Sequence, residues 1–389
     1  MDPNDLKPEL SAAEKDRRWS LVRERMSKEG LSAIIVYGCD GHTRDVPCRY
    51  MTNMPIIAGC RDILIFPADG EPVLLVTYPT QTFFAKRISW ISEENVHGST
   101  DIVNDLKKHL ESRNLMTERV GIEAPGLWPA QDYLAFLEAC PKVQLVDTSK
   151  WMSKIRAQKS DEELKLMREA VDIGELALEA FIDNLRPGMT EEKAVAPVEE
   201  ILRANGVEKR LWLMSSTPEM ASPWLPGETI IRKPNPILVS LEFQRSRGYT
   251  CQVVRNYCWE EPTGDYKKMF DLWKELRILP SEELRPGRNI NSLGQRIKEL
   301  VRDWGFECSM LGHGLGMDFF EEPAINSGPL EEEWLVMTNQ VFVFHPQVRP
   351  LGGGGPFVFV GDMYLVGEES TEWMTNFMPG LPEMISGSS

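Results

Sequence analysis

Three polar side chains in the C-terminal half have the types and spacing of a small catalytic cluster. Ser240 and Glu242 stand two residues apart in an apolar run, so on a strand both side chains point to the same face. A second apolar run, residues 249–257, would pair with the first as a hairpin and bring Gln252 beside them, with Cys251 on the opposite face and therefore excluded as a nucleophile. A carboxylate can act as a general base, and serine and glutamine can hold a ligand or water by hydrogen bonds.

Two of the five histidines, His313 and His345, lie in the β-rich last third of the chain. A histidine whose pKa is near neutrality can pass a proton, and a neighbouring carboxylate can set its tautomer and stabilise its charged form. General acid-base chemistry is then feasible without a metal ion. A structural role is the alternative for each group, because a lone buried histidine is more often a hydrogen-bonded core residue and Glu242 could pair with Arg247 or Arg255.

Composition excludes several classes of protein. The 389 residues carry 43 basic and 59 acidic side chains, a net charge of −16, which argues against general affinity for nucleic acid or an anionic membrane. The chain has no apolar run of about 18 residues and no signal-peptide pattern at its start, so we expect a soluble, cytoplasmic protein. Seven scattered cysteines without a close CxxC pair predict reduced thiols rather than a disulfide framework or a zinc ribbon.

The pattern of elements changes near residue 155. Before it, short β-rich runs alternate with helical stretches, and Asp69-Gly70 supplies the turn of an antiparallel hairpin, as expected of an α/β domain. After it, Ser160 caps a long amphipathic helix. Residues 211–232 contain three prolines and predict a long loop or broken strands, and the glycines at 352–355 predict a turn rather than a phosphate cradle.

The chain also carries short strings in a characteristic order: VPCRYMTNMP (46–55), IRAQKSDEELKLMR (155–168), RPGMT (186–190), RGYTCQVVR (247–255), GHGLG (312–316) and FVFHP (342–346). In these strings it resembles the aminopeptidase P, prolidase and creatinase superfamily. The resemblance implies an α+β protein with an N-terminal creatinase-like α/β domain, residues 1–155, and a C-terminal pita-bread catalytic domain, residues 156–389. It also implies a homodimer in which the partner's N-terminal domain borders the active site.

Most of that superfamily hold two divalent ions with two Asp, one His and two Glu, and the resemblance implies where these ligands would stand here. His313 matches the histidine ligand. Gln252 stands where the second Asp is expected, and His345 and Gly361 stand where the two Glu are expected. The first Asp corresponds to Ser240, or to Glu242 if the register follows the dimethylsulfoniopropionate lyase branch. Hard divalent ions need clustered oxygen anions, so we expect no two-metal site and no cofactor.

Further positions are singled out by the resemblance as substrate contacts. Arg61 lies near a carboxylate-binding arginine of creatinase-like proteins, Glu321 and Glu322 follow the His313 strand, and Trp224 lies near the cleft. For Glu321 and Glu322 the alternative is that they are ordinary exposed turn carboxylates, and for Trp224 the alternative is core packing. The Phe319-Phe320 pair replaces a segment in which the peptidases carry a second histidine, and the titrating groups of creatinase's own middle loop and hairpin are absent around Trp224 and Val254.

The leading hypothesis is a metal-independent, homodimeric enzyme on a small polar molecule, most plausibly hydrolysing a C–N bond. His313 and His345 would shuttle protons, Glu242 would act as base or orienting anion, and Ser240 and Gln252 would bind substrate. A lyase or decarboxylase on the same fold is the second hypothesis, and a non-catalytic binding module is the third. A single metal ion held by Glu242, His313 and His345 is chemically permissible, since two His and a carboxylate form a known ligand set.

Overall fold

The computed structural model describes residues 6–39, 45–57, 59–217, 222–245, 248–326, 333–353 and 355–385. Contacts divide the chain into two compact units, Met1–Arg156 and Ala157–Ser389. Arg247, and Gly354 of the glycine run, lie outside the described residues. In the described ranges no helix is both long enough and apolar enough to cross a membrane.

The first unit is built on one sheet with strand order β4-β3-β2-β1-β5-β6. Its strands are β1 (Ala33–Cys39), β2 (Arg61–Pro67), β3 (Val73–Thr77), β4 (Val96–Ser99), β5 (Arg119–Glu123) and β6 (Gln144–Asp147). Its helices are α1 (Ala12–Glu29), α2 (Val46–Thr52), α3 (Thr82–Ile88), α4 (Ile102–Ser112), α5 (Ala130–Ala139) and α6 (Ser149–Ala157). The predicted hairpin is β2 and β3, which pair antiparallel.

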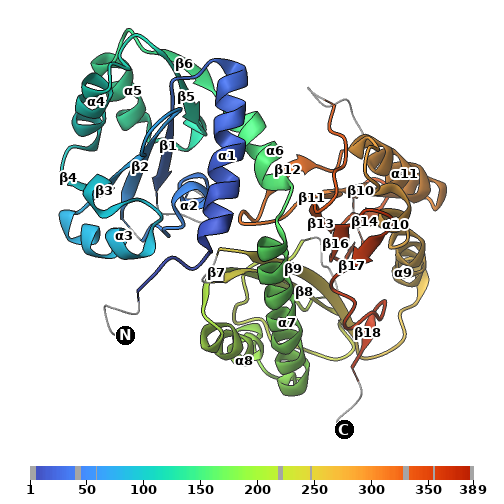
Figure 1. Cartoon of the computed structure of the whole chain (residues 1–389). Helices are drawn as coiled ribbons and strands as arrows, with labels where there is room; N and C mark the ends of the chain where they lie inside the picture. The colour runs from blue at the N-terminus through green and yellow to red at the C-terminus, as the bar shows by residue number, and fades with distance from the viewer. Residues whose placement is uncertain are drawn as a thin grey trace. The chain divides into compact units, whose positions relative to one another are not determined.

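Helices cover both faces of this sheet (Figure 1). Alternate residues of β1, among them Ile35 and Tyr37, pack with Leu106 of α4 and Phe136 of α5. On the other face Trp19 of α1 meets Phe66 edge-on, with ring centroids 5.4 Å apart. A sheet buried on both faces needs apolar side chains at successive positions, which explains the continuous apolar run in β1.

The second unit contains the remaining elements. Its helices are α7 (Asp161–Asn184), α8 (Glu191–Ala204), α9 (Gly264–Leu276), α10 (Leu279–Glu283) and α11 (Ile290–Asp303). Its longer strands are β7 (Val207–Ser215), β8 (Ile237–Arg245), β9 (Thr250–Cys258), β13 (Val341–Phe344) and β16 (Asp362–Val366). Its shorter strands are β10 (Phe306–Ser309), β11 (Gly312–Gly314), β12 (Glu321–Ala324), β14 (Gln347–Pro350), β15 (Val358–Phe359), β17 (Thr371–Trp373) and β18 (Glu383–Met384).

One face of the second unit's main sheets is covered by helices. Figure 1 shows α7 lying across β8 and β9, while α9 contacts β14 and β15 and α11 contacts β10. A capping box begins α7, in which Ser160 and Glu163 each bond the other's backbone N–H. A Cβ added to Gly174 of α7 would lie 2.9 Å from Cys251 Sγ. Cys251 therefore faces α7, as its place in the strand alternation predicts.

The loop predicted over residues 211–232 begins later than expected. Strand β7 runs to Ser215 and pairs antiparallel with β8, with Trp212 opposite Leu241 and Met214 opposite Val239. The prolines stand after this strand, so they do not interrupt its hydrogen bonds. The predicted hairpin of β8 and β9 and the long helix after Ser160 are confirmed.

A buried ion pair ties the two main sheets to the C-terminal segment on the helix-covered side. Arg255 Nη2 lies 3.0 Å from Asp362 Oδ1, and both side chains are at most 1% exposed. The same guanidinium donates to the backbone oxygens of Thr375 and Phe377. Asp362, although next to Gly361, thus points away from the face that carries Gln252.

We expect Asp362→Ala to lower the free energy of unfolding by about 3–5 kcal/mol, because it leaves the Arg255 charge buried and unpaired. Glu372→Ala is the matched control, since its pair with Arg168 is 47% exposed on both sides and should cost about 0–1 kcal/mol. Urea denaturation followed by circular dichroism measures both. Equal losses in the two variants would contradict the structural role assigned to the buried pair.

Candidate active site

A carboxylate, a hydroxyl and an amide lie together on the face of β8 and β9 that is opposite α7. Glu242 stands directly opposite Gln252 in the antiparallel pair, and Ser240 follows on the same face. The Ser240 hydroxyl donates to Glu242 Oε1 over 3.4 Å. Gln252 is 3% exposed, and its Oε1 has no hydrogen-bond partner among the described residues. A buried acceptor without a partner is costly, so this oxygen suits an N–H or O–H group of a ligand.

Burial sets the protonation of Glu242. Removing the carboxylate from water raises its pKa to about 7, and the Ser240 hydroxyl opposes the shift only in part. Near neutral pH the group is therefore present in both protonation states. A carboxyl of this kind can both accept and donate a proton in one reaction cycle.

The two imidazoles form a second group on the same unit. His313 lies in β11 and His345 directly follows β13, with ring centroids 5.1 Å apart and planes inclined by 69°. His313 Nδ1 lies 2.8 Å from the Gly314 oxygen, and His345 Nδ1 lies 2.9 Å from the Met310 oxygen. Because a carbonyl oxygen only accepts, each Nδ1 carries the hydrogen and each neutral ring keeps Nε2 as an acceptor.

The pKa of each imidazole is lowered, and that of His313 falls far below neutrality, in contrast to the sequence-based expectation. Burial, aided by His345, lowers the pKa of His313 to about 3, against the Gly314 hydrogen bond. Burial also lowers the pKa of His345. No carboxylate of the described residues lies within ion-pair distance of either ring, so no anion offsets the cost of a buried cation. Glu242, rather than a histidine, has a pKa suited to proton transfer at neutral pH.

Strand pairing puts both groups on one sheet face without bringing them into contact. Residues directly opposite in antiparallel pairs point the same way, and Val343 stands opposite both His313 on β11 and Met363 on β16. The Met363 sulfur in turn accepts a hydrogen bond of 3.4 Å from the backbone N–H of Gln252. An apolar cluster of Leu238, Val254, Phe357 and Phe359 lies on this face, and the Phe359 ring meets His345 edge-on at 5.6 Å. We expected Glu242, Gln252, His313 and His345 to converge in one cavity. They share one sheet face, but form two separate polar groups on it.

A cavity of about 400 Å³ opens at the imidazoles. Its lining includes His313, His345, Phe320, Lys298 and Asn326. The Phe320 ring lies over His313 with centroids 4.1 Å apart and planes inclined by 30°. The cavity therefore combines two neutral acceptors, an aromatic wall, an amide and an ammonium group.

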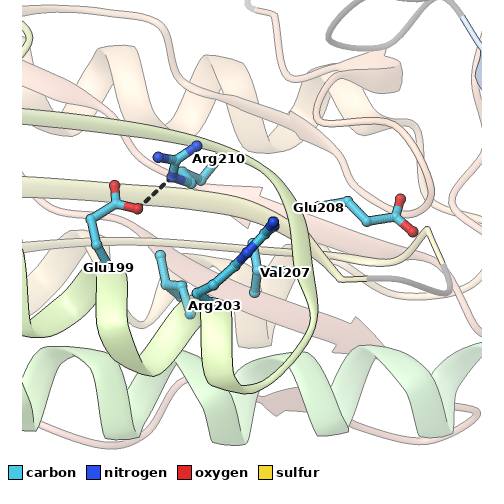
Figure 2. Close-up of a pocket in the computed structure, with 6 residues that line it drawn as sticks. Glu199, Arg203, Val207, Glu208 and Arg210 are labelled. Atoms are coloured by element: carbon cyan, nitrogen blue, oxygen red, sulfur yellow. Dashed lines mark hydrogen bonds and ion pairs between the residues drawn. The ribbon is translucent and has the colours of Figure 1, made fainter. Parts of the chain in front are cut away.

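A second cavity, of about 430 Å³, lies between α8 and β7 (Figure 2). Glu199 accepts a hydrogen bond of 2.6 Å from Arg210 there, and Figure 2 shows Arg203 and Val207 beside this pair. The pair is 40–49% exposed, and no histidine or cysteine lines the cavity. Exposed ion pairs are common on protein surfaces, so the cavity at the imidazoles is the better candidate site.

The other predicted substrate contacts are found in different surroundings. Glu321 is 3% exposed and its carboxylate lies 2.8 Å from Lys159 Nζ, whereas Glu322 is exposed. Trp224 is 75% exposed. In the first unit, Arg61 Nη1 lies 2.9 and 2.7 Å from the two oxygens of Asp132. The burial of Glu321 differs from the exposed turn carboxylate considered as its alternative, because an ion pair offsets the cost of its charge.

The residues present do not fit a two-metal centre. No three His, Cys, Asp or Glu side chains of the described residues lie close enough together to hold a metal ion. At Gly361, where the resemblance implies the family's final Glu, an added Cβ would come within 2.7 Å of Val254 Cγ2. The neighbouring carboxylate, Asp362, is engaged by Arg255 on the opposite face. Valine thus occupies the space that a ligand side chain at 361 would need.

Comparison with known families agrees with the fold. Residues 165–368 match the family model of metallopeptidase family M24, and residues 18–158 match the creatinase/prolidase N-terminal domain. The chain belongs to metallopeptidase family M24. The α+β architecture, a creatinase-like N-terminal domain followed by a pita-bread domain, is thereby confirmed.

Individual M24 relatives are distant but cover most of the chain. An uncharacterized peptidase of Bacillus subtilis is 24% identical over 329 residues, covering 80% of this chain and 88% of its own. Creatinase from a Bacillus species is 22% identical over 409 residues, covering 96% and 93%. The prolidase structure from Pyrococcus horikoshii has a TM-score of 0.77 at 18% identity, over 92% of this chain and 98% of that one. These M24 relatives are hydrolases, which supports hydrolase activity here.

Sequence patterns missed part of the cavity. Nothing in the spacing of Lys298 on α11 or of Asn326 after β12 pointed to the imidazoles, because the contact depends on how distant elements pack. Phe320 was noted only as a replacement for a histidine, whereas the ring covers His313. Lys159 lay in a recognised string, but no pattern gave its partner Glu321, 162 residues away.

We expect Glu242→Gln to remove a pH dependence of stability. The folded pKa of about 7 lies above the ordinary value of 4.5, so this carboxyl's contribution is fully present below about pH 4.5 and is lost as pH rises through about 7. Urea unfolding across this window should show the wild type losing stability relative to Glu242→Gln. The exposed Glu200→Gln is the control, and parallel curves for wild type and Glu242→Gln would contradict the assignment.

Proposed function

We propose that this M24 chain is a metal-independent hydrolase that breaks a C–N bond in a small polar molecule, with Glu242 as the proton-transferring group. The proposal depends on Glu242, because burial raises its pKa to about 7. Its side chain lies beside Gln252 on the face of β8 and β9 that is opposite α7. The neighbouring Gln252 Oε1 is buried without a partner among the described residues and would accept a hydrogen bond from substrate or water.

Hydrolysis of a C–N bond requires one proton to leave water and one to reach the departing nitrogen. In its ionised form Glu242 accepts the proton from the attacking water as the C–O bond forms, and in its protonated form it donates that proton to the nitrogen as the C–N bond breaks. The neutral imidazoles of His313 and His345 act as acceptors at Nε2 for N–H or O–H groups of the substrate. Ser240 orients the Glu242 carboxyl through its hydroxyl.

Metal independence is supported by the chemistry of the donor set. Where the resemblance implies acidic ligands of the metal hydrolases, this chain has Gln252, His345 and Gly361. Val254 fills the space beside Gly361. Removing three carboxylates removes most of the negative charge that compensates for stripping water from a divalent ion. The similarity to a creatinase, over 96% of this chain, motivates the choice of a C–N bond, although the groups assigned to the chemistry here are different ones.

The reaction and its metal independence can be tested together. Purified protein would be offered creatine and Xaa-Pro dipeptides in heavy-oxygen water, with and without EDTA. We expect product that contains the label, turnover insensitive to EDTA, kcat lowered about 100-fold or more in Glu242→Gln, and kcat lowered about tenfold or more in His313→Ala and His345→Ala. Glu200→Gln, exposed on α8, is the control and should keep full turnover.

Two outcomes would contradict this proposal. Product without label would indicate a lyase or decarboxylase, because only hydrolysis must incorporate oxygen from water. Activity lost on chelation and restored by Mn²⁺ would indicate a metal hydrolase despite the missing carboxylates.

We further propose a cytoplasmic homodimer in which Arg61 of the partner's N-terminal domain binds an anionic group of the substrate. The resemblance to creatinase-like proteins motivates the role of Arg61, and a guanidinium can bind a carboxylate through two parallel hydrogen bonds. Within one protomer an incoming anion would have to compete with Asp132 for this side chain.

Light scattering during gel filtration should give twice the chain mass of 44.3 kDa. With an identified anionic substrate, Arg61→Ala should raise KM more than it lowers kcat, because the lost contact binds rather than reacts. A monomeric mass, or an unchanged KM, would contradict the arrangement.

A further inference from the structure

A buried ion pair lies next to the imidazole cavity without lining it. Lys159 Nζ is 2.8 Å from Glu321 Oε2, and both side chains are at most 3% exposed. Lys159 stands just before the cap of α7, and Glu321 begins β12, so the pair joins two parts of the second unit that are 162 residues apart. The reaction proposed above assigns neither residue a role.

The other oxygen of the Glu321 carboxylate organises the turn between β11 and β12. Glu321 Oε1 accepts hydrogen bonds from the backbone nitrogens of Met317 at 3.2 Å and Asp318 at 3.4 Å. A Cβ on Gly316 would come within 2.7 Å of Glu321 Oε2, so the turn can close over the carboxylate only with glycine at this position. The carboxylate is therefore the centre around which residues 315–320 are wrapped.

That turn ends at Phe320, which covers His313. The Phe320 ring lies 4.1 Å from the imidazole centroid, and Phe320 is 54% exposed while His313 is only 3% exposed. One face of the phenyl ring thus shields the imidazole while the residue itself remains open to solvent. A change in the path of the turn would move Phe320 off the imidazole and expose it.

Lys159 is also attached to the element that leads to the second imidazole. Its backbone nitrogen donates to the Asn339 oxygen over 3.0 Å, in the turn just before β13. His345 directly follows β13, and β13 pairs with β11 through His313 opposite Val343. Lys159 accordingly contacts the turn before β13 through its backbone and, through its side chain, the carboxylate that organises the turn between β11 and β12.

We infer that Glu321 is a positioning residue: its carboxylate holds the turn that keeps Phe320 over His313 and the imidazole in its buried, Nε2-accepting state, while Lys159 offsets the buried charge of that carboxylate. The role in a reaction rests on the proposed function, whereas the positioning itself is a property of the folded chain. Stability alone does not require an ion pair here, since a buried pair can often be replaced by apolar side chains of similar volume without loss. What an apolar pair lacks is an acceptor for the Met317 and Asp318 N–H groups.

Two double variants separate positioning from stability. Lys159→Met with Glu321→Leu removes both charges and the acceptor, whereas Lys159→Met with Glu321→Gln removes both charges but keeps an oxygen for the turn. The measurement is the NMR shift of the His313 ring protons, assigned by comparison with His313→Gln. Phe320→Ala gives the reference shift of an uncovered imidazole, which should lie downfield because a stacked phenyl ring moves these protons upfield.

We expect the His313 signals of the Leu variant to move to the Phe320→Ala position and those of the Gln variant to stay at the wild-type position. Both double variants should melt near the wild type, whereas Lys159→Met alone should lower the Tm by about 10 °C because it strands a buried carboxylate. Wild-type His313 shifts in the folded Leu variant, or equal shifts in the two double variants, would overturn the inference.

If the Leu variant does not fold, amide hydrogen exchange of the wild-type protein tests whether Glu321 holds the turn. The Met317 and Asp318 amides should then exchange as slowly as those of β13, and fast exchange of either would overturn the inference. Neither readout depends on turnover, so the inference can fail or hold independently of the proposed hydrolysis.

Discussion

Burial of ionisable groups on one sheet face is the constraint on which the chemistry of this protein depends. Removing a charge from water favours the neutral form of every group, so the same physical effect raises the pKa of Glu242 and lowers those of His313 and His345. A carboxyl then titrates near neutrality and the imidazoles remain neutral. The assignment of proton donor and acceptor follows from where each side chain is buried rather than from its residue type.

The free-energy cost of burying polar groups is offset to different extents on the two faces of the sheet. On the helix-covered face, Arg255 and Asp362 offset each other's charge, and on the edge of the cavity Lys159 and Glu321 do the same. On the uncovered face, Glu242 and Gln252 have no such compensation from the described residues, beyond one long hydrogen bond from Ser240. In a compensated pair each charge offsets the cost of burying the other, whereas uncompensated buried polar groups are typical of sites that bind or react with a ligand.

Membership of family M24 accounts for the fold, and the strand register of that fold positions the candidate site. Strand pairing puts positions 242, 252, 313 and 361 on one face, because register depends on the apolar pattern of β8, β9, β13 and β16. Val254 beside Gly361 and the cluster with Phe357 and Phe359 make this part of the face apolar, which increases the desolvation that Glu242 and the imidazoles experience.

Local patterns in the sequence predicted most helices and strands, and they predicted the grouping of Ser240, Glu242 and Gln252 in the candidate site. Alternation put Ser240 and Glu242 on one face, the hairpin brought Gln252 opposite Glu242, and Ser160 began α7, because these features depend on neighbours a few residues away. The extent of β7, the neutral state of His313, its cover by Phe320 and the partnership of Lys159 with Glu321 were decided by tertiary structure alone. Each depends on burial or on contacts between distant segments, and a residue's identity does not specify the solvent or the partners that folding leaves around it.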